Sequence, residues 1–66
     1  MSKSLALLRK DTAAARRLAD RRDTLIADAR RDGVTWREIA AAAGLTDLAT
    51  RHAAIRGNGG VLPTPR

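Results

Sequence analysis

Residues 34–56 read VTWREIAAAAGLTDLATRHAAIR, and this stretch decides the fold because it predicts two short helices joined by a tight turn. Thr35 is placed to cap the first helix with its hydroxyl, and Glu38 is placed to reach back to the Thr35 backbone N–H, as in a capping box. Gly44 ends that helix, because a left-handed backbone costs a glycine almost nothing. Thr46 is a second N-cap and begins the next helix. The stretch therefore predicts a helix-turn-helix unit.

Part of this stretch resembles a known module. Residues 35–46, TWREIAAAAGLT, look like the first half of the helix-turn-helix in small DNA-binding proteins of actinobacteria and their phages. Ala40 stands where the two helices touch most closely, Gly44 is the turn glycine, and an aliphatic and a hydroxyl residue follow it. Residues 21–33, RRDTLIADARRDG, are similar to the supporting first helix of the same proteins, and the likeness covers residues 18–56. The resemblance implies a DNA-binding module.

The second helix of the motif departs from that pattern. Such units usually carry branched aliphatic residues where Thr50 and Ala53 stand here, and the larger apolar residues of this helix are Leu48 and Ile55 instead. Leu48 and Ile55 are seven residues apart, which places them on one helical face. Either the helix is rotated from the usual pose, or Thr50 is buried as a near-isostere of valine.

The chain before the motif predicts one long helix. Residues 4–32 are rich in alanine, leucine and arginine, which are good helix formers, with Ser4 as the expected N-cap and Gly33 at the end. An imperfect apolar stripe runs along this segment, with Asp11 and Arg22 in its gaps; its members are Leu8, Ala15, Leu18, Leu25 and Ala29. A break near Asp11 and Thr12, either of which can cap a new helix, is the alternative.

The fold class expected from these patterns is all-α, with three helices or possibly four. A helical domain spans residues 1–56, and its helices cover 4–32, 35–43 and 46–56. A tail rich in glycine and proline follows at 57–66; we expect it to be flexible or extended after an ordered turn, with Val61 and Leu62 available to dock on the helices.

Composition limits the classes of function. The chain has 66 residues, no cysteine, one histidine, a net charge of +6 and an isoelectric point near 11.6. A charge of this size on so small a body favours a polyanion, with nucleic acid ahead of an anionic membrane, although a merely solubilising surface is the simple alternative. No apolar run approaches the ~20 residues of a membrane span, and none matches a signal peptide. We expect a cytoplasmic protein without a membrane partner.

DNA-contacting residues are expected near the start of each motif helix. Arg51, Asp47 and Thr50 are the candidates for base contacts on the exposed face of the second helix, with arginine able to read guanine bidentately. Asp47 is better explained as a favourable charge at a helix N-terminus. The candidates for phosphate contacts are Thr35, Trp36, Arg37, Thr46, Arg30, Arg31, His52 and Arg56. For Trp36 the indole N–H could donate to a phosphate while the ring covers the core edge; most other arginines fit a solvated helix face.

The first residues carry leucines without an evident partner. Leu5, Leu7 and Leu8 lie at the far end of the long helix, and helix-turn-helix proteins usually bind paired half-sites as dimers. We therefore expect this segment to pair with its copy in a homodimer. Folding onto its own chain as a fourth helix is the alternative.

Three functions follow from the sequence, in decreasing order of support. The first is a protein that binds double-stranded DNA, as a small transcriptional regulator or a phage-type repressor or excision factor. The second is a protein-interaction module that captures a host or partner protein with the same fold. The third, an amphipathic helix on an anionic membrane, lacks the bulky apolar face that such helices use. An enzyme is not expected, because no nucleophile with a base, carboxylate pair, metal cluster or phosphate loop is evident; hence no cofactor and no metal are expected.

Overall fold

A computed structural model describes residues 2–66, and this part of the chain is all-α, as predicted. Three helices follow one another: α1 (Lys3–Arg31), α2 (Trp36–Ala43) and α3 (Asp47–Gly57). The expected helices agree with these bounds to within a residue at each end. α1 is continuous, so the alternative break near Asp11 does not occur; the Thr12 hydroxyl donates back to the Leu8 carbonyl at 2.8 Å instead. Ser4 is not the N-cap, because the helix begins two residues earlier, with Ser2 at the N-cap position.

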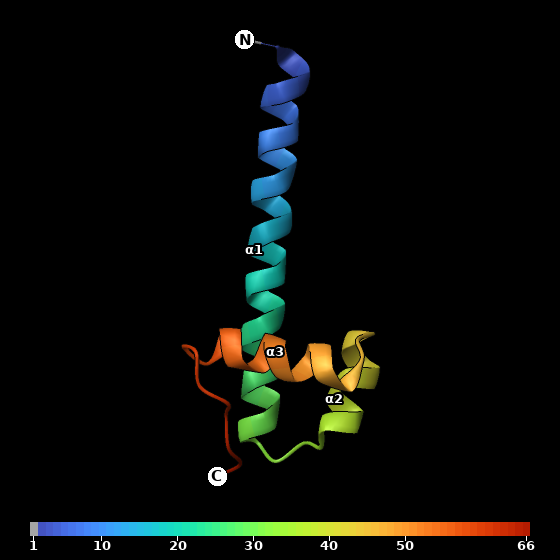
Figure 1. Cartoon of the computed structure of the whole chain (residues 1–66), viewed down its shortest axis with the longest axis vertical. Coiled ribbons are helices and arrows are strands. Elements are labelled where there is room, and N and C mark those ends of the chain that lie inside the picture. Colours follow the sequence, from blue (N-terminus) through green and yellow to red (C-terminus); the bar gives the residue numbers. More distant parts are fainter. Residues whose placement is uncertain (1) are drawn as a thin grey trace.

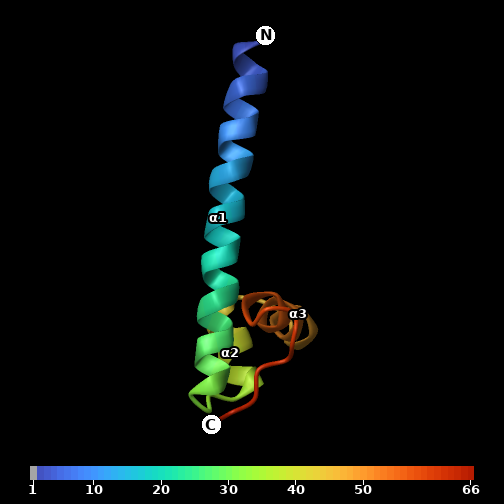
Figure 2. The ribbon, with the colours of Figure 1, turned by 90° about the vertical axis from the view of Figure 1, so that its left-hand side faces the viewer.

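The molecule is elongated because only the C-terminal part of α1 is covered. Its extents are 49 × 22 × 16 Å, and α3 crosses α1 near its lower end while α2 lies beside it (Figure 1). Seen from the side, the N-terminal part of α1 projects alone from this base (Figure 2). The leucine-rich start therefore forms no fourth helix on its own chain: Leu5, Leu7 and Leu8 are all exposed on the projecting arm.

The core is small and is built mainly from alanine and isoleucine. Its buried cluster consists of Ile26 from α1, Ile39 from α2, and Ala53 and Ala54 from α3. Alanine lets α3 approach α1 closely, and the isoleucines fill the space toward α2. Trp36, Val34 and Leu45 are among the half-buried side chains that pack around this cluster.

Most of the apolar stripe of α1 does not face this core, and of its members only Ala29 packs against the buried cluster. Leu18 is 71% exposed and Leu25 is 57% exposed, whereas the buried residues of α1 are Asp23, Ile26 and Ala27. The reason is steric, since α3 lies so close to α1 that only small or slender side chains fit between them. The larger leucines are left on a neighbouring face of the helix.

The predicted N-caps at Thr35 and Thr46 are confirmed, whereas the predicted capping box is only half formed, because the Glu38 side chain accepts no hydrogen bond from the Thr35 N–H in the described structure. The Thr35 hydroxyl accepts a hydrogen bond from the Glu38 N–H at 3.2 Å, and the Thr46 hydroxyl accepts one from the Ala49 N–H at 3.1 Å. Gly44 adopts a left-handed conformation with φ of +68° and ends α2. Leu45 then donates from its N–H to the Ala40 carbonyl at 3.0 Å, which closes the turn.

Thr50 belongs to the core, so its prediction as an exposed base-contact residue is wrong. Its exposed fraction is 0%, and its hydroxyl donates to the Thr46 carbonyl at 2.8 Å. That intrahelical bond satisfies the hydroxyl, which lets threonine occupy a fully buried position. Of the two interpretations of the unusual second helix, burial of Thr50 as a near-isostere of valine is confirmed.

The C-terminal tail is extended and runs back along the foot of α1 (Figure 1). The Asn58 side chain donates to the Val61 carbonyl at 2.9 Å, and the Arg66 N–H donates to the Arg31 carbonyl at 3.0 Å. Pro63 is buried, whereas Val61 and Leu62 are exposed. The expected docking of Val61 and Leu62 is therefore wrong, and the rigid proline makes the contact instead.

The tightest point of the fold is the crossing of α1 and α3. A Cβ atom added to Gly57 would lie 2.1 Å from the carbonyl oxygen of Asp23, so only glycine permits this approach. Asp23 is only 5% exposed. Its carboxylate accepts a hydrogen bond from Arg56 Nε at 3.0 Å, next to the contact between Gly57 and the Asp23 backbone. Backbone proximity and the ion pair together fix where α3 sits on α1.

We predict that Gly57→Ala destabilises the fold far more than Gly44→Ala. Gly57→Ala forces the two helix backbones apart and should cost about 3 kcal/mol, at the upper end of what overpacked core sites usually cost. Gly44 has nothing within 4 Å of its added Cβ, so Gly44→Ala should cost only the left-handed strain of about 1 kcal/mol. Urea unfolding followed by circular dichroism measures both. Equal midpoints for the two variants would show that the crossing tolerates a Cβ.

Candidate nucleic-acid interface

The starts of α2 and α3 are both exposed and polar. Thr35, Arg37, Thr46 and Asp47 are all exposed there, at or next to the two N-caps. Free backbone N–H groups at helix N-termini favour an anion, and an arginine beside them adds a mobile positive charge. The one printed contact that connects the two helices near these ends is Arg51 of α3 over the Trp36 ring of α2.

Trp36 joins all three helices at this surface. The guanidinium carbon of Arg30, from α1, lies 4.8 Å from the centre of the Trp36 ring, and that of Arg51, from α3, lies 5.7 Å from it. Both distances fit cation–π attraction. Arg30 Nη1 also donates to the Val34 carbonyl at 3.1 Å, which holds it against the link between α1 and α2. The half-buried indole therefore gathers two positive charges beside the α2 N-terminus.

The arginines of this cluster keep their charge available. Within residues 2–66, the ion pairs involve Arg22, Arg31 and Arg56, and none involves Arg30, Arg37 or Arg51. Arg30 Nε is buried without a hydrogen-bond partner, so this guanidinium is not fully satisfied by the protein. Unpaired guanidiniums held near one another repel, and an anion placed between them relieves that repulsion.

Two other predicted phosphate contacts are engaged inside the molecule. Arg31 donates to the side chains of Asp28 and Asn58, which ties α1 to the start of the tail. Arg56 donates to Asp23 through Nε, and this hydrogen bond, with the attraction of the carboxylate charge, raises the pKa of Arg56. Both arginines therefore serve the fold, and their charges are partly offset.

The remaining α3 candidates lie at the surface. Arg51 and His52 are exposed, and Asp47 is exposed in the first turn of the helix. With Thr50 turned inward, Asp47 and Arg51 are the base-contact candidates that remain accessible. Arg51 rests over the Trp36 ring, so it would leave that ring to reach a base edge.

Sequence reasoning missed two parts of this site. The Trp36 cluster joins residues from three helices, and no spacing in the chain signals that Arg30 and Arg51 meet at one ring. The buried Asp23 did leave a signal, because it precedes Ile26 and Ala27 by three and four residues and so shares their helical face.

Compared with known proteins, the chain matches no family model, no curated protein and no solved structure. Among residues 2–66, no helix is long and apolar enough to cross a membrane. The same part of the chain holds no group of three or more His, Cys, Asp or Glu side chains suited to a metal ion.

We predict that Arg30→Gln lowers stability while Arg37→Gln does not. Arg30→Gln removes a cation–π contact and the hydrogen bond to Val34, with an expected loss of about 1 to 2 kcal/mol. Arg37 is exposed and makes neither contact, so its substitution should stay within about 0.5 kcal/mol. Thermal unfolding followed by Trp36 fluorescence reports both. Equal stability of the two variants would contradict the role given to Arg30.

Proposed function

We propose that this protein binds double-stranded DNA through the surface formed by the starts of α2 and α3. The observation that carries the proposal is the gathering of Arg30, Arg37 and Arg51, all free of carboxylate partners, around Trp36 and the α2 N-terminus. The chain's net charge of +6 adds long-range attraction for a polyanion. The resemblance of residues 35–46 to small helix-turn-helix proteins points to the same partner.

Each residue of the surface then has a distinct role. Arg37 and the hydroxyl of Thr35 contact backbone phosphates beside the α2 N-terminus, and we expect the Trp36 indole N–H to donate to a phosphate as well. These contacts set position and affinity but read no sequence. Arg51, with Asp47 in the turn before it, contacts base edges from α3. The biological role that fits is a small transcriptional regulator, or a repressor or excision factor of the phage type.

A salt series separates these roles. The logarithm of the wild-type association constant should fall linearly with the logarithm of salt concentration, and Arg37→Ala should reduce the slope by about one unit. Arg51→Ala should lose about 1 to 3 kcal/mol of discrimination between a selected duplex and a mixed-sequence duplex. Fluorescence anisotropy of labelled DNA measures all of these.

Arg17→Ala is the matched control for charge alone. Arg17 is an exposed arginine in the projecting part of α1, outside the proposed surface. The loss of this side chain should leave the discrimination between the selected duplex and the mixed-sequence duplex unchanged. The proposal fails if the wild type does not bind any duplex at low salt, or if Arg17→Ala weakens binding as much as Arg37→Ala does.

A protein-interaction module is the second candidate function. The observation that favours it is the exposed leucines of the projecting arm, including Leu7 and Leu8, which are unusual for a free helix end. A chain that does not bind DNA but retains these apolar residues would act through that arm on a host or partner protein.

A further inference from the structure

The exposed stripe of α1 has the spacing of a coiled-coil seam. Steps of three and four residues connect Leu8, Asp11, Ala15, Leu18, Arg22 and Leu25, which therefore occupy alternating a and d positions. All six residues are exposed. Two of them are charged, with opposite signs, and they lie on either side of the middle of the stripe.

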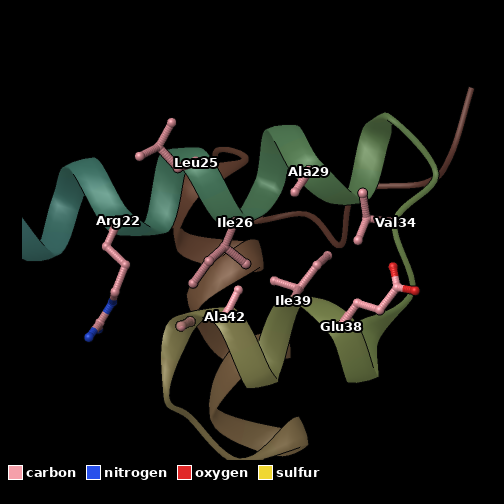
Figure 3. A pocket seen from close by; sticks show the side chains of 9 residues that line it. Arg22, Leu25, Ile26, Ala29, Val34, Glu38, Ile39 and Ala42 are labelled. Carbon is pink, nitrogen blue, oxygen red and sulfur yellow. The ribbon is translucent and has the colours of Figure 1, made fainter.

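A groove lies at one end of this stripe. It has a volume of about 340 Å³ and runs between α1 and α2. It is lined by Leu25 and Ala29 from α1, by Val34 from the link that follows α1, and by Ile39 and Ala42 from α2 (Figure 3). The groove is therefore largely apolar and opens beside the exposed Leu25.

The two charged positions decide how such a stripe could pair with itself. Parallel pairing in register would set Asp11 against Asp11 and Arg22 against Arg22, which is unfavourable for both charges. Antiparallel pairing that sets Leu8 opposite Leu25 of a second copy brings Asp11 opposite Arg22. The same register brings Ala15 opposite Leu18, a small residue against a large one. Shifting the antiparallel register by one heptad instead leaves Asp11 opposite Ala15 or Ala29.

Arg22 is available for this pairing. Its guanidinium is 3.9 Å from the Asp23 carboxylate, beyond hydrogen-bond distance, and its side chain is well exposed. Asp23 already accepts from Arg56 at 3.0 Å. An Asp11 carboxylate from a second copy would therefore give Arg22 a better partner than the one it has.

We propose that two copies of this chain pair through antiparallel α1 helices in this register, with Leu5 and Leu8 of each copy covering the groove of the other. The sequence indicates that a second copy of the chain covers the groove. One antiparallel register sets Asp11 of each copy opposite Arg22 of the other, and it places the leucines opposite apolar residues. It also accounts for the leucines at the start of α1, which are exposed in the single chain. The pairing does not depend on whether the protein binds DNA.

The antiparallel pairing sets the distance between the two DNA-binding surfaces of the dimer, and this consequence rests on the proposed function. Ile26 of one copy lies level with Leu7 of the other, so the two Ile26 residues are separated by the helical rise from residue 7 to residue 26. That rise is about 28 Å at ~1.5 Å per residue. The two bases of the dimer thus stand near the roughly 34 Å that separates half-sites on one face of a duplex.

Cross-linking single-cysteine variants tests the orientation, because the chain has no cysteine of its own. We expect Leu8→Cys mixed with Leu25→Cys to give a covalent dimer with a short bis-maleimide. Leu8→Cys alone should give at least tenfold less covalent dimer, since the two substituted side chains at position 8 of the dimer would lie about 25 Å apart. Leu48→Cys, at an exposed leucine on α3, is the control for random collision.

Charge reversal tests the register by sedimentation. Asp11→Arg and Arg22→Asp should each weaken dimerisation at least tenfold, because each sets like charges against one another. The double variant should recover to within about threefold of the wild type, since it restores opposite charges in every layer. Circular dichroism checks that each variant keeps its helices.

The proposal is overturned if Leu8→Cys cross-links with itself as readily as with Leu25→Cys, which would mean a parallel pair. It is equally overturned if the wild type sediments as a monomer at all concentrations, or if the double charge variant does not recover. These outcomes are read without DNA, so they leave the proposed DNA binding to its own test.

Discussion

The close approach of α3 to α1 is the constraint on which the rest of the structure depends. Gly57 meets the Asp23 backbone where no Cβ fits, and Asp23 accepts from Arg56 beside that contact. Ala53 and Ala54, both fully buried, continue the small-residue surface along α3. In such a core each small side chain buries little apolar area. The stabilising van der Waals contacts come mainly from the closely packed helix backbones.

That constraint explains what is left outside. Leu18 and Leu25 cannot enter a contact shaped for alanine and glycine, so they remain exposed on α1. Thr50 does enter it, because its slender side chain satisfies its own hydroxyl through the Thr46 carbonyl. A chain this short buries a modest fraction of its surface, and further burial is most readily gained by association. The exposed stripe, with its complementary charges, is suited to that.

The basic surface follows from the same crossing. By fixing α3 on α1, the crossing brings Arg51 to Trp36, while Arg30 reaches the ring from the end of α1. Arg31 and Arg56 are used to hold the helices and the tail. The arginines are thus divided between structural pairs and an unpaired group. Two of the unpaired arginines, Arg30 and Arg51, lie over Trp36 at the start of α2, where an anion is favoured.

The sequence by itself determined the helices and the turn, because these depend on hydrogen bonds between near neighbours. Thr35, Gly44 and Thr46 each act within a few residues of their own position, so their pattern was sufficient. Only the tertiary structure decided which face of α1 is buried, that Thr50 points inward, and that Arg30 and Arg51 share one indole. Those outcomes depend on how closely the helices pack, and a stripe of leucines was a poor guide to a core that selects its residues by small size.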